Sequence, residues 1–260
     1  MTIDDLTALV SAQREAAWGD VARRIAHEIK NPLTPIQLSA ERLKRKFGKL
    51  AGDERENFDQ YADVIVRQAA DIRRMVDEFS RFARMPEPET APTDLAKLTR
   101  EAVLLQSAAR EDIAYDLTGA EDVLMVDCDA GLISQALTNL LKNAAEAIDG
   151  RLETTPEPGG EIRVRLADVE GAIRLTIEDN GVGLPGAERS RLTEPYVTTR
   201  KKGTGLGLAI VKKIAEQHRG ALTLEDAAPF AEGQSEGARA VITLPTTSSS
   251  QTNEKKDSEA

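Results

Sequence analysis

Several residue types and patterns that define other classes of protein are scarce or missing in this sequence. Cys128 is the one cysteine among 260 residues, so no internal disulfide can form and a reducing compartment is expected. It is better explained as a small buried residue than as a reactive thiol. No apolar run approaches the length of a membrane span, and no signal peptide opens the chain. We therefore expect a soluble portion of a cytoplasmic protein, whose full-length parent could still be anchored in a membrane.

Clustered positive charge is also missing. The 34 Lys and Arg residues are outnumbered by 44 Asp and Glu residues, which gives a net charge of −10 and no basic stripe. Nucleic acid is therefore not expected as a partner. With 40% hydrophobic and 30% charged residues the chain is globular, and its length allows one large or two small domains.

Histidine occurs only twice, and His27 lies in the most informative stretch. Around it, apolar residues recur every three or four positions, which predicts one helix with a narrow buried stripe. The stripe comprises Val21, Ile25, Ile29, Leu33, Ile36, Ala40, Leu43 and Phe47. At about 100° per residue His27 falls nearly opposite this stripe, with Asn31 on the same outer face. A surface imidazole beside Glu28, which can orient it, is a candidate nucleophile.

Two prolines complicate this helix. Asn31-Pro32 also fits a helix start, with Asn as the cap and Pro in the first turn. Inside a helix, Pro32 and Pro35 should each cost about 3 kcal/mol and bend it. The unbroken stripe favours a single helix with a kink below His27.

A second long helix completes a hairpin. After a break at 48–53, apolar residues from Phe58 to Phe79 repeat at helical spacing, and the helix ends near Met85. A lone hairpin cannot cover its own stripe, so two hairpins are expected to pair into a four-helix dimer. Residues 1–19 continue the first helix, either as a coiled-coil lead-in or as a frayed extension.

A stiff acidic linker at 86–92 marks the expected domain boundary. The region 93–245 alternates helices and strands and predicts an α+β domain with helices on one face of a mixed sheet. Residues 246–260 read as a disordered tail, and no internal repeat is visible. Helices are expected at 94–109, 129–148 and 205–218, and strands at 113–117, 123–126, 161–166, 172–178, 221–225 and 238–244.

Two glycine-rich segments in this domain suit a nucleotide. The segment 179–183, Asp-Asn-Gly-Val-Gly, follows a strand, so its carboxylate could meet a purine amino group, although such a turn is also ordinary hairpin chemistry. The segment 203–207, Gly-Thr-Gly-Leu-Gly, precedes a helix whose amides could hold phosphates. Asn139 and Asn143 share one helix face; such amides are more often surface or capping groups, and Mg²⁺ becomes credible only with phosphates nearby.

The residues from His27 to Ile36 closely resemble the phosphoacceptor box of sensor histidine kinases. The longer run 18–45 resembles the nitrogen-regulation sensor kinases of the NtrY type. This resemblance implies a dimerisation and histidine-phosphotransfer domain at 20–85. It also implies an ATP-binding α+β sandwich at 93–245, of the type that histidine kinases share with certain ATPases.

The remaining motifs match that family in order. The run 139–147 is similar to its N box, which implies Asn143 as Mg²⁺ ligand with Asn139 in support. The run 179–183 is similar to the first glycine box, which implies Asp179 on the adenine amino group. The resemblance assigns nucleotide contacts to Gly181, Gly183, Tyr196, Gly203, Thr204, Gly205, Leu206 and Gly207.

The sequence departs from the family at two points. Tyr196, beside the segment that flanks the ATP lid, stands where many members have Phe. Glu146 stands where many have a basic residue, so phosphate neutralisation falls to Lys142, Arg200 or Lys201, which could equally be solvated surface charges.

The resemblance implies ATP-dependent autophosphorylation on His27, with Glu28 favouring the reactive tautomer. The phosphoryl group would then pass to an aspartate of a response-regulator receiver domain, NtrX-like in type. Asn31 would orient water for regulator dephosphorylation, and Leu38 would help to dock the regulator. The rival hypothesis is a dimeric nucleotide-binding scaffold that transfers nothing.

Overall fold

The computed structural model describes residues 3–47, 55–83, 85–169, 171–186, 189–198, 203–230 and 236–246. The side chains of residues 3–24 and 81 are outside this description, as are the predicted break at 48–53, the coiled-coil register of 1–19 and the tail beyond 246. The chain divides into two compact units, Met1–Pro86 and Glu87–Ala260, and each is considered by itself.

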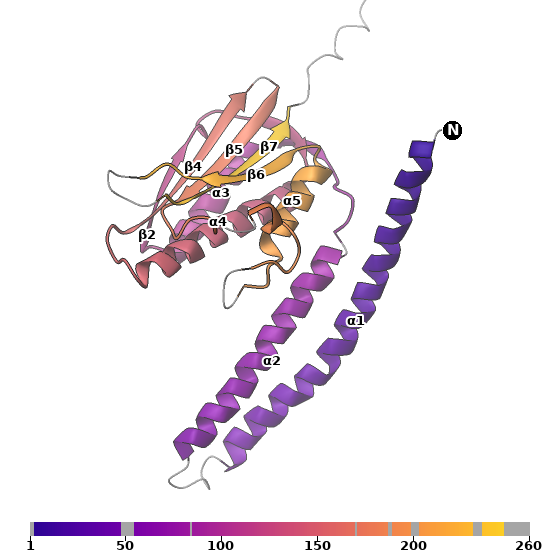
Figure 1. Ribbon diagram of the computed structural model, residues 1–260, viewed down its shortest axis with the longest axis vertical. Coiled ribbons are helices and arrows are strands. Elements are labelled where there is room, and N and C mark those ends of the chain that lie inside the picture. Colours follow the sequence, from indigo (N-terminus) through magenta and orange to yellow (C-terminus); the bar gives the residue numbers. More distant parts are fainter. Residues whose placement is uncertain are drawn as a thin grey trace, which may run out of the picture. The chain divides into compact units, whose positions relative to one another are not determined.

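The first unit is a hairpin of two long helices, α1 (Ile3–Phe47) and α2 (Arg55–Ala83). They lie side by side along much of their length (Figure 1). Helix α1 continues through Pro32 and Pro35, so the prediction of one helix is confirmed and Pro32 does not begin a new one. In Figure 1 the helix is curved, in the manner expected when proline removes backbone hydrogen bonds.

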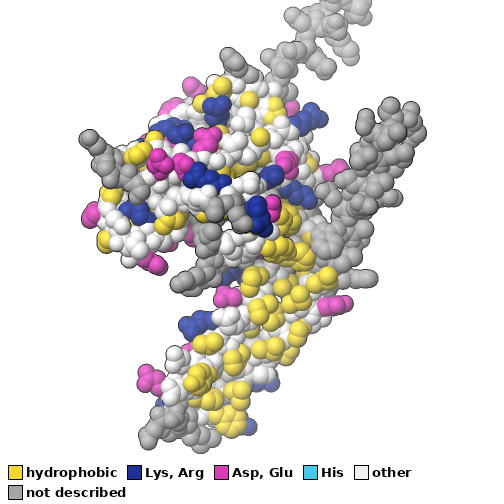
Figure 2. Space-filling model, in the orientation of Figure 1, with side chains coloured by type: hydrophobic (Ala, Val, Ile, Leu, Met, Phe, Trp, Pro, Cys, Tyr) yellow, Lys and Arg dark blue, Asp and Glu magenta, His cyan; other side chains and the backbone are white. Residues whose placement is uncertain are grey.

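The seam of the hairpin is narrower than the apolar stripe. On each helix the buried residues are seven apart, which is the heptad spacing of coiled coils. They are Ala26, Leu33 and Ala40 on α1 and Ala62, Ala69 and Val76 on α2. Most of the predicted stripe is not buried, and Figure 2 shows apolar side chains along the hairpin surface. The exposed members of the stripe are Ile25, Ile29, Ile36, Leu43 and Phe47.

This outcome agrees with the expectation that a lone hairpin cannot cover its own stripe. Two packed helices bury only one narrow line of residues on each other. Each apolar stripe is wider than that line, so its outer members stay exposed. Pairs across the hairpin flank the seam: Lys44 binds both carboxylate oxygens of Asp63 at 2.7 and 2.8 Å, and Lys30 pairs with Asp77.

The second unit is built on a five-stranded mixed sheet in the order β2-β4-β5-β7-β6. Strands β2 and β4 are parallel and the other neighbours are antiparallel. Three helices lie on one face of the sheet (Figure 1), which confirms the predicted α+β class. The strands are β2 (Ile113–Thr118), β4 (Gly160–Val169), β5 (Ala172–Asp179), β6 (Ala221–Asp226) and β7 (Ala238–Pro245).

Helices α3 (Leu95–Ala109), α4 (Ala130–Leu152) and α5 (Gly207–Gln217) form the second layer. The side chains of Asp94 and Asp129 accept hydrogen bonds from the first turns of α3 and α4, so both helices begin close to the starts expected at 94 and 129. The core lies between these helices and the sheet. Its largest fully buried side chains include Leu137, Leu141, Ile148, Ile162, Leu175, Ile214 and Ile242.

Two elements were not predicted. Strand β1 (Ala91–Asp94) begins inside the segment expected to be a linker, and it pairs antiparallel with β3 (Met125–Cys128). A 3-10 turn, η2, covers Arg189–Arg191. Helix α4 also runs beyond its expected end at Ile148, because Arg151 donates to carbonyl groups of the following loop and holds that loop against the helix.

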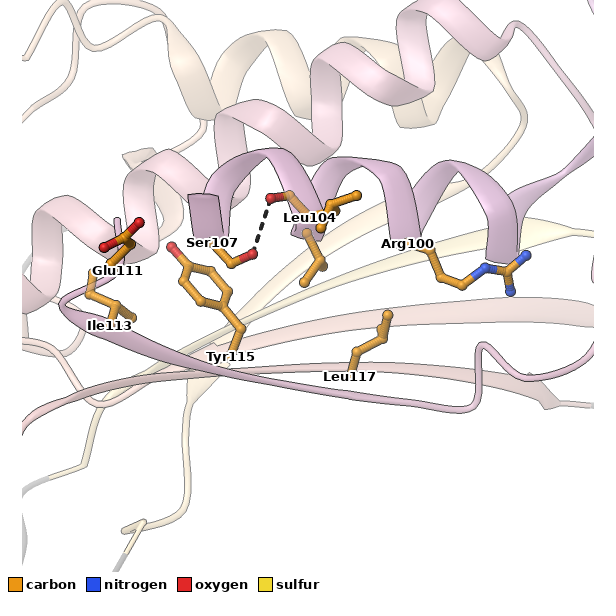
Figure 3. A pocket seen from close by; sticks show the side chains of 8 residues that line it. Arg100, Leu104, Ser107, Glu111, Ile113, Tyr115 and Leu117 are labelled. Atoms are coloured by element: carbon orange, nitrogen blue, oxygen red, sulfur yellow. Dashed lines mark hydrogen bonds between the residues drawn. The ribbon is translucent and has the colours of Figure 1, made fainter. Parts of the chain in front are cut away.

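A hollow of about 650 Å³ lies between α3 and β2 (Figure 3). Leu104 and Ser107 line it from the helix, and Tyr115 and Leu117 from the strand. None of the residues predicted to bind nucleotide lines it. Within the described ranges, no helix combines the length and apolar character needed to cross a membrane.

Candidate functional site

His27 lies on an open face of α1. Its side chain is exposed, as are those of Glu28 and Asn31, while Ala26 and Leu33 are buried in the seam. This placement agrees with the helical-wheel prediction that the histidine points away from the hairpin interior. An accessible imidazole beside a carboxylate meets the first requirement for a nucleophile that must approach a second substrate.

In the second unit, one face of α4 gathers the predicted nucleotide motifs. Asn139, Asn143 and Ala147 are four residues apart and therefore lie on successive turns of the same face. The Asn143 amide lies beside the second glycine segment: a methyl group on Gly207 would come 3.5 Å from its Nδ2 and 3.6 Å from its Oδ1. Asn143 thus faces the segment that was predicted to hold phosphates, and Asn139 lies one turn away on the same helix face.

The first glycine segment packs one turn further along the same face. The Val182 N–H donates to the Ala147 carbonyl at 3.1 Å. A side chain on Gly181 would come 2.5 Å from the Ala147 carbonyl carbon, so only glycine fits there. Helix α4 therefore brings together two glycine segments that are more than twenty residues apart in sequence.

Asp179 is the last residue of β5 and is only 6% exposed. Its Oδ1 accepts the Gly181 N–H at 2.9 Å, which orients the carboxylate. The buried side chain of Asn180 fixes the same turn, since it donates to the Gly159 carbonyl and accepts the Glu161 N–H, both at 2.9 Å. A carboxylate held in this way can accept a hydrogen bond from an adenine amino group.

Sequence reasoning missed two residues that shape this turn. Asn180 was read only as part of a turn, although an amide directly after a strand end can be a structural link. Gly237 was not noted: a methyl group there would come 1.6 Å from the Asp179 carbonyl oxygen. No local sequence pattern predicts that contact, because it joins the end of β5 to the start of β7.

Tyr196 is joined to the second glycine segment. Its N–H donates to the Gly205 carbonyl at 3.0 Å, and a methyl group on Gly205 would come 2.6 Å from the Tyr196 carbonyl carbon. Both residues have a positive φ, +67° for Tyr196 and +69° for Gly205. The Tyr196 side chain is 58% exposed, and burial of its remainder raises the pKa of the phenol. The ring thus lies at the surface beside this segment.

The remaining residues predicted to contact nucleotide differ in burial and in backbone conformation. Gly183 has a φ of +73° and leaves no room for a side chain against the Glu236 carbonyl oxygen. Leu206 is buried, and its N–H reaches the Thr204 hydroxyl at 3.4 Å. Gly203 is half-buried. Each of these residues lies within or directly beside the two glycine segments.

The charges that would neutralise phosphates remain a prediction. Lys142 is exposed on α4, and its Nζ lies 3.9 Å from a Glu146 carboxylate oxygen, which is a surface pair one turn apart. Arg200 and Lys201 lie outside the described residues.

The donor set fits a magnesium ion that is held mainly by phosphates and water. In the described part of the chain, no three His, Cys, Asp or Glu side chains gather into a metal site. Asn143 offers one amide oxygen, a ligand that suits Mg²⁺, which keeps several waters and usually binds substrate phosphates as well. The Nδ2 of Asn139 is buried without a hydrogen-bond partner, so this amide can still donate to an oxygen in the site.

Comparison with known proteins agrees with this arrangement. Residues 17–88 match the His Kinase A (phospho-acceptor) domain. Residues 128–248 match the Histidine kinase-, DNA gyrase B-, and HSP90-like ATPase family.

Among named proteins, the nitrogen regulation protein NtrY of Azorhizobium caulinodans is 55% identical over 229 residues, or 87% of this chain and 29% of that protein. A putative sensor histidine kinase of Rickettsia felis, NtrY-like, is 43% identical over 83% of this chain and 35% of its own length. The chain therefore spans about a third of the length of these relatives.

Solved structures share the fold. The mycobacterial sensor histidine kinase MprB aligns with a TM-score of 0.51 and 32% identity, over 60% of this chain and 97% of that one. Histidine kinase ThkA, solved in complex with the response regulator protein TrrA, aligns with a TM-score of 0.60 and 24% identity, over 91% of this chain and 64% of that one.

The two family matches fall on the two structural units in the expected order, His27 lies in the first, and the nucleotide motifs meet in the second. The chain belongs to the sensor histidine kinases, the protein-histidine kinases of two-component signalling, and within them it resembles the NtrY type.

Proposed function

We propose that this chain is the catalytic core of a sensor kinase that phosphorylates His27 with ATP. The observation that carries the proposal is the meeting of both glycine segments on the asparagine face of α4, together with an exposed histidine on a separate unit. A bound nucleotide and an accessible nucleophile are the two components that phosphoryl transfer to a side chain requires.

The proposed roles are consistent with the positions of these residues. Asp179 accepts a hydrogen bond from the adenine amino group, and the N-terminal amides of α5 hold phosphate oxygens. A ring nitrogen of His27 attacks the γ-phosphorus, the bond from that phosphorus to the bridging oxygen breaks, and ADP leaves. Glu28 accepts a hydrogen bond from the other ring nitrogen, which carries the proton. When bound at Asn143, with Asn139 beside it, Mg²⁺ supplies charge stabilisation to the phosphates.

We further propose that phospho-His27 passes its phosphoryl group to an aspartate on a response-regulator receiver domain, NtrX-like in type. Leu38 is exposed and lies on the same helix, where it can contact such a partner. Asn31, which is one turn after His27 and also exposed, would orient water in regulator dephosphorylation. The exposed apolar stripe supports pairing of two hairpins into a homodimer.

The proposed boundaries are 20–85 for the phosphotransfer domain, 86–92 for the linker and 93–245 for the ATP-binding domain. We place this portion of the protein in the cytoplasm, where ATP is supplied. Lys142, Arg200 and Lys201 are the proposed phosphate-neutralising cations.

The test is incubation with γ-labelled ATP and Mg²⁺, followed by acid. Wild-type protein should acquire an acid-labile label, whereas His27→Gln should acquire none and should bind ATP with unchanged affinity in calorimetry. Acid-labile label on the variant would show that another residue is the acceptor. ATP binding without any labelling of the wild type would instead favour the scaffold hypothesis.

A further inference from the structure

The second histidine, His218, has no part in the proposed reaction and yet is held on both sides of its ring. It caps the C-terminal end of α5 and is 5% exposed. Its Nε2 accepts the Asp129 N–H at 2.9 Å, and its Nδ1 lies 2.7 Å from the Ile214 carbonyl oxygen. A backbone N–H can only donate and a carbonyl can only accept, so the ring is neutral with its proton on Nδ1.

This environment differs from the one expected for a histidine at a helix C-terminus. The helix dipole would favour a cation there. The neutral ring instead links two helices, because its Nε2 accepts a hydrogen bond from the backbone N–H of Asp129, the residue that caps α4. In a charged imidazole Nε2 would carry a proton and could no longer accept the Asp129 N–H, whereas Nδ1 could still donate to the Ile214 carbonyl.

Asp129 is a firm anchor for this link. Its carboxylate accepts the N–H groups of Gly131 and Leu132, which cap α4, and the N–H of Glu89 at 3.1 Å. Burial works against the charged form, but these three backbone donors hold the pKa of Asp129 below its ordinary value. The residue that binds His218 is therefore fixed by contacts that do not involve α5.

Helix α5 lies against α4 near both of its ends. At its start, Gly207 lies beside the Asn143 amide, and just beyond its end His218 accepts a hydrogen bond from the Asp129 N–H. Fourteen residues separate the two positions on α4, or about 21 Å along a helix, so the two helices run antiparallel. The bond at His218 therefore joins the end of α5 to the start of α4, on the same pair of helices that brings Gly207 to Asn143.

We infer that His218 is a positioning residue for the phosphate-binding part of the nucleotide site. The inference rests on the proposed function, since it assumes that the start of α5 meets ATP phosphates. Asp179 accepts the Gly181 N–H at the end of β5, and Gly181 packs against Ala147 on α4, so both are positioned by β5 and by the Ala147 end of α4. Loss of the His218 link should therefore disturb phosphate binding and leave adenine binding intact.

Two substitutions test the two hydrogen bonds of the His218 ring separately. The amide of His218→Gln reaches to the position of Nε2 and can still accept the Asp129 N–H. The shorter amide of His218→Asn reaches only to Nδ1, where it can donate to Ile214 but not bind Asp129. ATP with Mg²⁺ and adenosine are titrated into each protein by calorimetry, well below its melting temperature.

His218→Asn should bind ATP roughly three- to tenfold more weakly than wild type, the range of one hydrogen bond, and should bind adenosine equally well. His218→Gln should stay close to wild type for both. Equal ATP affinity in all three proteins, or parallel weakening for ATP and adenosine, would overturn the inference. A wild-type protein that binds neither ligand would refute the proposed function itself.

The wild-type protein offers a second measurement in case His218→Asn does not fold. The backbone amide resonance of Asp129 should shift when ATP and Mg²⁺ are added and stay unchanged with adenosine. Identical responses to the two ligands would contradict a link between this hydrogen bond and the phosphates.

Discussion

The hairpin and the ATP-binding unit differ in the size of the side chains that they bury. Every one of the largest fully buried side chains in the described chain lies in the second unit. Among its described side chains the hairpin buries mostly alanines, while the isoleucines and Phe47 remain exposed. The second unit therefore has a complete core of its own, whereas the hairpin leaves most of its apolar stripe uncovered. We expect their stabilities to respond differently to mutation and to protein concentration.

The most severe test of this contrast is a charge in the exposed stripe. Ile36 is 47% exposed on α1, and pairing of two hairpins would bury it. Ile36→Glu should abolish dimerisation, because a carboxylate in an apolar seam is strongly unfavourable. Sedimentation equilibrium would measure the change, with Ser39→Glu, an exposed position outside the stripe, as the matched control. A dimeric Ile36→Glu protein would remove the stripe from the interface.

Truncation inside the second unit should have a different signature. Leu137 is fully buried on α4, so Leu137→Ala should lower the free energy of unfolding of this unit by about 2–5 kcal/mol. The loss should not depend on protein concentration. Denaturant melts would show it, with the 75% exposed Leu105→Ala as the control, for which little change is expected. A concentration-dependent loss would mean that this core is also shared between chains.

Asp179→Asn should affect the ATP-binding unit alone. An amide can still accept the Gly181 N–H, but it is a weaker acceptor for the adenine amino group than a carboxylate. ATP affinity should fall by roughly 10- to 100-fold, the range of a hydrogen bond to a charged group. Calorimetry would measure the loss, and Asp168→Asn at an exposed position of β4 should bind normally. Unchanged affinity would exclude Asp179 from the nucleotide site.

A smaller gain in stability is expected at the end of α5. Arg219 has a φ of +58°, which is unfavourable for a residue with a side chain. Arg219→Gly should stabilise the second unit by about 1 kcal/mol, whereas Arg219→Ala should not. Thermal unfolding of the two variants would distinguish them, and equal melting temperatures would show that the strain is relieved elsewhere.

The smallest effect concerns acid stability at the turn after α3. Arg110 binds Asp112 at 2.7 and 2.8 Å and lowers the pKa of that carboxyl to about 2. A depressed pKa contributes stability above the unfolded value, and this contribution is lost as the pH falls toward 2. The melting temperatures of wild type and Asp112→Asn should therefore differ at neutral pH and converge in acid. A difference that persists in acid would assign it to packing.

Periodicity and caps made most of the fold predictable. The stripes of α1 and α2 and the capping residues Asp94 and Asp129 are local signals, and local signals fix where helices begin. The order of the motifs likewise predicted the family, since the two matched domains fall in the expected order. The pattern did not specify individual contacts: the same stripe is compatible with a buried seam or with an exposed face, and only the packing of the hairpin shows which members are buried.

Long-range contacts account for the other omissions. Strand β1 is four residues long and exists because β3 pairs with it. The need for glycine at position 237 comes from the Asp179 carbonyl, more than fifty residues earlier. His218 was visible in the sequence, but its partner Asp129 is 89 positions away. Local sequence patterns do not predict contacts between residues so far apart in the chain.

The exposed stripe of the hairpin has a thermal consequence. Burial of apolar surface lowers the heat capacity, so pairing of two hairpins should show a negative heat-capacity change in calorimetry at several temperatures. The driving force for such burial weakens on cooling. The hairpin pair should therefore loosen in the cold, at temperatures where the closed core of the ATP-binding unit is still intact.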